Sequence, residues 1–276
     1  MGFPRKVLVG IGMLVAAIWI GTFLVSSGGA SERVSSLGDI LGKYADQKPR
    51  LWGEDIPGVL RTFEPDGKQV ALTLDACGGP RGSGYDEEIV DFLRENEIPA
   101  TLFLNARWIE ANPEIAADLA SDPLFLIANH GWRHRPCSVT GRSAWGIEGT
   151  KNLEEAYREI ERGAAAVRRL TGKRPRFYRS GTNYYDEVAV AVVRDLGMNV
   201  VGWSVLGDEG ATLPAEKVAE RVFEAKPGQI ILCHMNQPDS GTAEGLTQGI
   251  RALLEKGFRF VTLDEIFQAD GEGLSF

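Results

Sequence analysis

The three histidines of this 276-residue chain are its most informative residues, because they fall at or just after the ends of apolar runs. His130 and His134 have the H-x3-H spacing in NHGWRH, and His234 ends the run QIILCH. If the first segment is helical, residues four apart share a face, so both imidazoles can reach one ion. Imidazole is also the usual acid–base group near neutral pH. We therefore predict that the three histidines belong to a site for metal binding or acid–base chemistry, with His130 and His134 able to share one ion.

Asp75 closes another apolar run and precedes a glycine-rich turn, in the segment TLDACGG. A carboxylate in that position suits a metal ligand or a general base. The ordinary alternative is an aspartate that caps the next turn or helix. Arg179 and Asp208 also come after apolar runs. Both are therefore further candidates for the same site.

Short apolar runs with the composition of β-strands occur at 70–75, 100–105, 124–129, 176–179, 199–204, 229–234 and 258–263. Amphipathic helical patterns alternate with them at 86–96, 112–120, 152–170, 185–196, 215–225 and 244–256. The alternation predicts a parallel α/β sheet, closed into a barrel or left open, in one domain over about residues 68–270. In such folds the carboxyl ends of the strands meet at one rim, where the loops carry the chemistry. We expect the candidate residues to gather at that rim.

The N-terminal residues predict a membrane segment. A basic pair precedes the apolar run 7–25, and a helix of that length spans about 28 Å, close to the thickness of a bilayer core. Small residues at 26–30 leave a second interpretation open, a signal peptide that is cleaved there. Residues 1–30 are thus a signal peptide or transmembrane anchor, and 31–67 a stalk or pre-domain segment. The body is expected in the periplasm or cell envelope, anchored to the inner membrane, or secreted after cleavage.

The composition is that of a globular protein, with 43% hydrophobic and 25% charged residues. The 38 acidic and 30 basic residues give a formal net charge of −8, which argues against nucleic acid as a partner because phosphates need a basic face. Outside the cytoplasm a disulfide is allowed, and Cys77 and Cys137, both in expected rim loops, are the pair that could form one. Strand alternation should instead bury Cys233. The composition does not determine the oligomeric state.

Together these segments resemble the polysaccharide deacetylases of the NodB-homology type, carbohydrate esterase family 4. The resemblance covers about residues 68–268 and rests on the order and spacing of TLDACGG, IPATLFL, NHGWRH, RFYRSG, VVGWSVLGD, IILCHM and GFRFVTLDEI. It implies a distorted (β/α)7 barrel. It also implies removal of N- or O-linked acetyl groups from a polysaccharide with a divalent metal, most often zinc.

The resemblance implies a role for each matching position. Asp75 matches the catalytic base, and Arg179 matches the arginine that orients it. His234 matches the general acid for the leaving group, and Asp208 is the nearest match to the acid of the fourth motif. The usual prolines of the third motif are absent, because Ser180 and Gly181 follow the arginine.

His130 and His134 match the two metal-binding histidines of the family, but the third metal ligand departs from its pattern. The family has a second aspartate directly after the catalytic one, whereas this chain has Ala76, which cannot bind a metal. Four explanations stay open. Asp75 binds the metal itself, Asp86 folds back to supply a carboxylate, Cys77 binds as a thiolate that would favour zinc, or metal binding is lost.

We therefore predict a metal-dependent hydrolase that removes acetyl groups from a cell-envelope or extracellular polysaccharide. The oxyanion of the tetrahedral intermediate would lie against the metal and a backbone N–H in the Gly78–Gly79 turn. One alternative is a catalytically inactive carbohydrate-binding module on the same fold, which would keep its glycan binding after metal removal. The other is a hydrolase of cyclic amides or imides, which a secretion signal disfavours.

Overall fold

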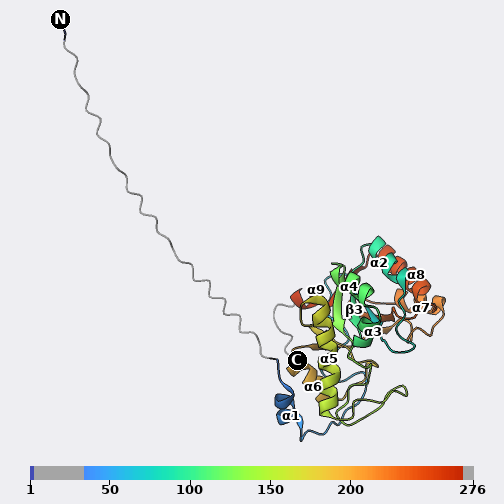
Figure 1. Cartoon of the computed structure of the whole chain (residues 1–276). Helices are drawn as coiled ribbons and strands as arrows, with labels where there is room; N and C mark the ends of the chain where they lie inside the picture. The colour runs from blue at the N-terminus through green and yellow to red at the C-terminus, as the bar shows by residue number, and fades with distance from the viewer. Residues whose placement is uncertain (3–33, 270–276) are drawn as a thin grey trace. The chain divides into compact units, whose positions relative to one another are not determined.

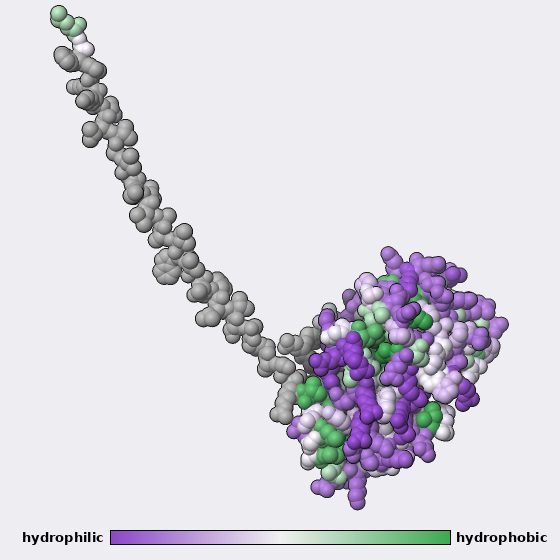
Figure 2. All heavy atoms as spheres, in the orientation of Figure 1, coloured by the Kyte–Doolittle hydropathy of each residue, from purple (hydrophilic) through white to green (hydrophobic). Residues whose placement is uncertain are grey.

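The computed structural model describes residues 1–2 and 34–269, and a compact unit begins at Val34 (Figure 1). The predicted membrane segment at 7–25 lies outside the described residues. Within the described part of the chain, no helix is both long and apolar enough to cross a membrane. The face of the compact unit in Figure 2 is mainly hydrophilic, with hydrophobic residues in small separate patches.

A curled parallel sheet forms the centre of this unit. Its strands in the described chain are β1 (Val59–Leu60), β2 (Gln69–Ala76), β3 (Ala100–Leu104), β4 (Phe125–Asn129), β5 (Phe177–Tyr178), β6 (Asn199–Val201), β7 (Val205–Leu206), β8 (Ile230–His234) and β9 (Arg259–Val261). They pair in the order β1-β6-β5-β4-β3-β2-β8-β7, and β9 pairs with the beginning of β2. The path does not return from β7 to β1 in the described residues, so the sheet is a half-barrel and is not closed. The prediction of a parallel α/β sheet is confirmed.

Helices cover the outer face of this sheet. They are α1 (Leu37–Tyr44), α2 (Glu87–Glu95), α3 (Ala106–Ala111), α4 (Pro113–Ser121), α5 (Leu153–Thr171), α6 (Glu187–Asp195), α7 (Ala215–Phe223), α8 (Thr242–Glu255) and α9 (Leu263–Ala269). In Figure 1, α2, α7 and α8 lie together on one side of the unit. On the other side, α1 and α6 lie beside the lower part of the long helix α5. Asn152 caps the first turn of α5, and Gly172 ends the helix in a left-handed conformation (φ 75°), which glycine adopts without strain.

The alternation of side chains along β2 separates two environments. Leu72, Leu74 and Ala76 point outward into the hydrophobic layer beneath the helices. Ala71 points into the half-barrel, where it packs with Phe103, Ala128, Phe177, Val201, Ile230 and Val261. Thr73 and Asp75 follow on the same inner face, since successive residues of a strand point to opposite sides. The interior is therefore apolar at the base and polar toward the carboxyl ends of the strands.

The segment predicted as a stalk begins to pack on the sheet unit well before residue 68. Helix α1 contacts α5 and α6, and β1 pairs with β6 through Val59 and Val200. Ile40 and Tyr44, four residues apart on α1, are both buried. This short apolar stripe indicates an amphipathic helix, although the composition of the segment as a whole is charged. The compact unit thus includes residues 34–67.

Candidate active site

The carboxyl ends of neighbouring strands bring the predicted residues to one rim. Asp75 in β2 and His234 in β8 are register partners on adjacent parallel strands. His130 directly follows β4, and Arg179 directly follows β5. Asp75, His130 and Arg179 are all almost completely buried. Four residues far apart in the sequence therefore meet in one place, as parallel strand ends require.

Arg179 crosses the interior of the half-barrel to reach Asp75. Its Nη1 donates to Asp75 Oδ1 at 2.7 Å and to Thr73 Oγ1 at 3.0 Å. Its Nε and Nη2 donate to the backbone carbonyls of Val201 and Gly202. The side chain is wholly buried, and a buried charge is stable only when it is paired and hydrogen-bonded, as here. This arrangement fixes Asp75 Oδ1 and leaves Oδ2 facing His130 Nε2 at 3.5 Å.

His130 and His134 lie in a loop, and the helix that their spacing suggested does not form. Gly131 has φ 73° and His134 has φ 61°, so the chain turns back on itself between the two rings. The ring centroids are 5.0 Å apart and nearly perpendicular. Gly181 explains one departure from the family pattern, because a Cβ there would lie 2.3 Å from the His134 carbonyl carbon. The glycine lets the loop after β5 approach this turn.

Cys77 completes a cluster with the two histidines. Each of the three side chains offers one ligand atom, and these atoms lie within 4.8 Å of one another. The Cys77 Sγ is 3.9 Å from His130 Nε2. Burial raises the pKa of the Cys77 thiol, but His134 and His130 lower it more, so this pKa lies well below its usual range. Burial lowers the pKa of His130, and Asp75 and Cys77 raise it above the usual value overall.

The donors of this cluster fit a divalent metal ion. His134 Nε2 is buried and has no hydrogen-bond partner among the described residues, which is unusual for a polar atom that no ion satisfies. His130 Nδ1 contacts the backbone oxygen of Arg179 at 3.0 Å, which leaves Nε2 toward the cluster. Such a backbone contact to the second nitrogen is typical of metal-binding histidines. Zinc–nitrogen and zinc–sulfur bonds of about 2.0–2.3 Å suit ligand atoms at these separations.

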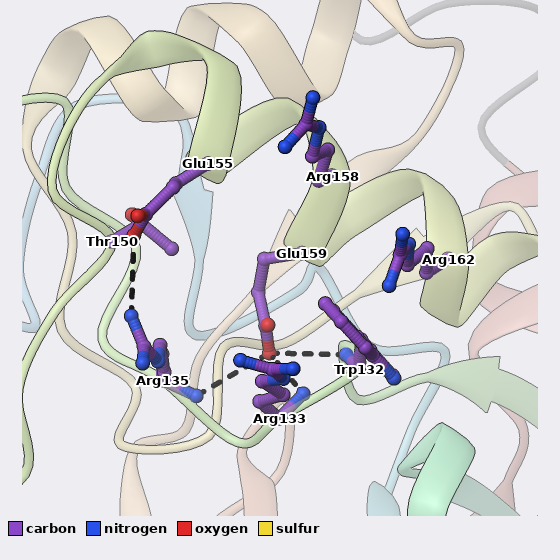
Figure 3. Close-up of a pocket in the computed structure, with 8 residues that line it drawn as sticks. All are labelled: Trp132, Arg133, Arg135, Thr150, Glu155, Arg158, Glu159 and Arg162. Carbon is purple, nitrogen blue, oxygen red and sulfur yellow. Dashed lines mark hydrogen bonds and ion pairs between the residues drawn. The ribbon is translucent and has the colours of Figure 1, made fainter.

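Glu159 fixes the loop that carries His130 and His134 through hydrogen bonds to its backbone (Figure 3). This residue of α5 is only 2% exposed, and its Oε1 accepts from the backbone N–H groups of Trp132 (3.0 Å), Arg133 (2.8 Å) and Arg135 (3.4 Å). Burial raises the pKa of Glu159, and the three N–H groups act against that shift. Sequence reasoning missed this residue. The signal was a glutamate between Ala156 and Gly163 on the buried face of an amphipathic helix.

Replacement of Glu159 by alanine is expected to loosen this loop. Three backbone N–H groups lose their acceptor, so the free energy of unfolding should fall by about 1–3 kcal/mol. Metal affinity should fall about 10–100-fold, as for other residues that support metal ligands. Thermal unfolding and competition with a chelator measure the two effects. The matched control is Glu154→Ala, which removes only an exposed ion pair with Arg158; equal losses in both variants would contradict the role of Glu159.

His234 forms an acid–base pair with Asp208 and also interacts with Cys77. The His234 Nδ1 lies 2.9 Å from Asp208 Oδ1, and the His234 backbone N–H donates to Oδ2 at 2.7 Å. Thr242 Oγ1 donates to the same Oδ2 at 3.2 Å. Burial lowers the pKa of His234, but Asp208 raises it well above the usual value overall. Burial raises the pKa of Asp208, and His234 lowers it below its usual range overall. The pair therefore favours an imidazolium beside a carboxylate.

Three sequence expectations around the site differ from the structure. Asp86 is not part of the cluster, because it is the N-cap of α2 and its Oδ1 accepts from the Ile89 N–H. Of the two N–H groups in the Gly78–Gly79 turn, that of Gly78 donates to the Gly82 carbonyl at 2.8 Å and is not available to an oxyanion. Cys77 and Cys137 do not form a disulfide. Cys137 is wholly buried in the hydrophobic cluster around α6, whereas Cys77 faces the histidines.

An aromatic cluster joins the loops that follow Arg179 and His134 to the segment between α1 and β1. The Tyr184 ring centroid is 5.7 Å from that of Trp52 and 5.8 Å from that of Trp145. Trp145 is 73% exposed, which is uncommon for so large an apolar side chain. Tyr184 connects to the site loop through its carbonyl, which accepts from Ser180 Oγ at 3.1 Å. Exposed aromatic faces of this kind can pack against the apolar faces of sugar rings.

Comparison with known proteins identifies the family. The family model described as polysaccharide deacetylase matches residues 63–201, half of the chain. The chain therefore belongs to the polysaccharide deacetylase family, a family of hydrolases that act on carbohydrates, and the resemblance seen in its motifs is confirmed.

Named relatives add detail to this assignment. A peptidoglycan-N-acetylglucosamine deacetylase of Bacillus cereus is 28% identical over 207 residues, which are 74% of this chain and 70% of the relative. The crystal structure of the Bc1960 peptidoglycan N-acetylglucosamine deacetylase matches with a TM-score of 0.65 at 26% identity, over 76% of this chain and 93% of that one. A carbohydrate esterase family 4 pseudoenzyme from Bacillus anthracis shares the fold, with a TM-score of 0.63 at 23% identity over 80% of this chain and 70% of that one.

Proposed function

We propose that this protein is a metal-dependent deacetylase that removes N-linked acetyl groups from N-acetylglucosamine residues of a cell-envelope polysaccharide. The observation that carries the proposal is the meeting of Asp75, the two loop histidines and His234 at one rim. The names of the relatives, which are peptidoglycan deacetylases, support this substrate class and an envelope location. The exposed Trp145 and its neighbours offer a surface on which a polymer could extend beyond the site.

His130 and His134 would hold the metal ion. When bound, a divalent ion of this kind supplies a Lewis acid for the acetyl carbonyl and lowers the pKa of a water molecule. The protein then has to remove a proton from that water and deliver one to the leaving nitrogen. Each of these steps needs a group within hydrogen-bond reach of the reacting atom.

Asp75 Oδ2 is the proposed proton acceptor. Arg179 Nη1 holds Oδ1 at 2.7 Å, so the carboxylate cannot rotate freely, and Oδ2 stays on the side of the histidine cluster. Arg179 is thus a positioning residue in this proposal, because it acts through Asp75.

His234 is the proposed proton donor to the leaving amine. The Nδ1 of His234 is hydrogen-bonded to Asp208, so the Nε2 of His234 is the nitrogen that can face the substrate. An imidazolium can donate from that atom, and the buried carboxylate of Asp208 keeps the ring in this form and orientation. Asp75 and His234, which are register partners on adjacent strands, would therefore have opposite roles in proton transfer.

The test is release of acetate by the full-length protein from peptidoglycan and from chitin oligosaccharides. We expect acetate release that a chelator abolishes and that His134→Ala reduces to background, because that variant lacks the buried, unpartnered Nε2. Ala76 makes the catalytically inactive binding module the second candidate, as does the pseudoenzyme with this fold. Retained glycan binding in the presence of chelator, with no acetate released under any metal, would establish that candidate and refute the deacetylase.

A further inference from the structure

The residue that follows Asp75 faces away from the site. Ala76 is the last residue of β2, is completely buried, and packs in the hydrophobic layer that also contains Leu104 and Trp108. At position 76 this chain therefore presents a methyl group to the hydrophobic layer and no metal ligand to the site.

The next residue returns to the inner face. Side chains alternate along a strand, so Cys77 continues the series of Thr73 and Asp75. Gly78 and Gly79, with φ 71° and 87°, turn the chain sharply just after it. A Cβ at Gly78 would lie 2.7 Å from the Trp108 backbone nitrogen, so only glycine allows this close approach. The turn holds the thiol beside the two histidines.

We infer that the Cys77 thiolate is the third protein ligand of the metal, together with His130 and His134. The inference rests on the proposed function, which supplies the metal. Two independent observations carry it. One ligand atom from each of the three side chains lies within 4.8 Å of the others, and His134 carries a buried Nε2 that has no hydrogen-bond partner in the described chain.

A thiolate replaces the missing carboxylate without changing the charge of the site. Both groups carry one negative charge, so the set of two neutral imidazoles and one anion keeps the same total. Two histidines and one cysteine also match the number of protein ligands in a catalytic zinc site, which keeps one position open. Sulfur is a soft donor, so the site should prefer zinc and cobalt over magnesium, calcium or manganese. Asp75 is then free of the metal and available as the base.

Cobalt substitution tests the sulfur ligand directly. The full-length protein loaded with Co²⁺ should show an intense near-ultraviolet sulfur-to-cobalt charge-transfer band. Cys77→Ala should lose that band and bind Zn²⁺ at least about 100-fold more weakly, since even residues that only support the ligands contribute 10–100-fold. Cys77→Asp should lose the band but retain Zn²⁺ better than the alanine variant. A Co²⁺ complex of the unaltered protein without the band would overturn the inference.

Thiol reactivity gives a second test that needs no variant. Cys137 and Cys233 are 0% exposed and serve as internal controls, whereas Cys77 is partly exposed. In the folded metal-free protein, one thiol should react rapidly with an alkylating reagent, and mass spectrometry should locate the label on Cys77. Zn²⁺ should protect it, and denaturation should expose all three cysteines. Equal labelling of Cys77 with and without bound Zn²⁺ would contradict the inference.

The two tests separate this inference from the proposed function. Acetate release by a protein whose Co²⁺ complex lacks the band would refute the sulfur ligand and leave the deacetylase intact. A strong band and full protection of Cys77, with no acetate released, would establish the ligand and refute the deacetylase.

Discussion

Replacement of Asp75 by asparagine is expected to lower kcat about 10²–10⁴-fold, the usual contribution of a general base. Bound zinc should remain, because Asp75 is outside the Cys77, His130 and His134 cluster. Asparagine has nearly the same shape but cannot accept a proton from water at neutral pH. The loss should therefore appear in kcat much more than in KM. Acetate release and metal content, measured on the same preparation, check both parts.

The same substitution has a structural cost that the assay must allow for. Arg179 is buried and would lose its ion pair with Asp75, although Thr73 and two backbone carbonyls remain. Breaking a buried ion pair costs about 3–5 kcal/mol, so activity should be measured well below the melting temperature of the variant.

Asp86→Asn is the matched control for this prediction. Asparagine also caps helices well, so the beginning of α2 should be preserved. We expect metal content and kcat close to those of the unaltered protein. If Asp75→Asn loses zinc in proportion to its activity, Asp75 is a metal ligand; if Asp86→Asn loses zinc, the carboxylate of that residue reaches the metal.

The arrangement of the site was partly predictable from the sequence. The polar residues at the strand ends meet as expected, because parallel strands with helical connections leave all their carboxyl ends at one edge. That rule places Asp75, His130 and His234 without any knowledge of distances. The lengths of the strands were predicted less well. β5 and β6 have only two and three residues, fewer than their apolar runs suggested, and the remaining residues form site loops.

Two features were not predictable from spacing alone. H-x3-H fits one face of a helix, but Gly131 within it permits a tight turn that also brings both rings together. The hydrogen bonds from the loop to Glu159 stabilise the turn, and the spacing of the histidines does not reveal them. Cys77 was recognisable in principle, since positions 73, 75 and 77 share one face of a strand. Where β2 ends and turns was the missing information, and Gly78 and Gly79 determine it.

Replacement of Asp208 by asparagine is the second change with a large expected effect. The carboxylate stabilises the imidazolium of His234 through a hydrogen bond of 2.9 Å and through its charge. Without that charge the pKa of His234 falls, so less of the proton donor is present at any pH near this pKa. The alkaline limb of the kcat–pH profile, where His234 loses its proton, should therefore move to lower pH. At neutral pH and above, kcat on an amide substrate should fall on the order of 10²–10⁴-fold.

The leaving group distinguishes a proton donor from a residue that merely maintains the fold. An amine must be protonated as it departs, whereas a nitrophenolate departs without a proton. The defect of Asp208→Asn should therefore be much smaller on an aryl acetate than on an acetylated amino sugar. Thr242→Val is the control, because it removes one hydrogen bond to Asp208 but keeps the carboxylate charge beside His234, so its kcat should fall much less than that of Asp208→Asn. An equal loss on both substrates, or an unmoved alkaline limb, would show that Asp208 does not act through the His234 proton.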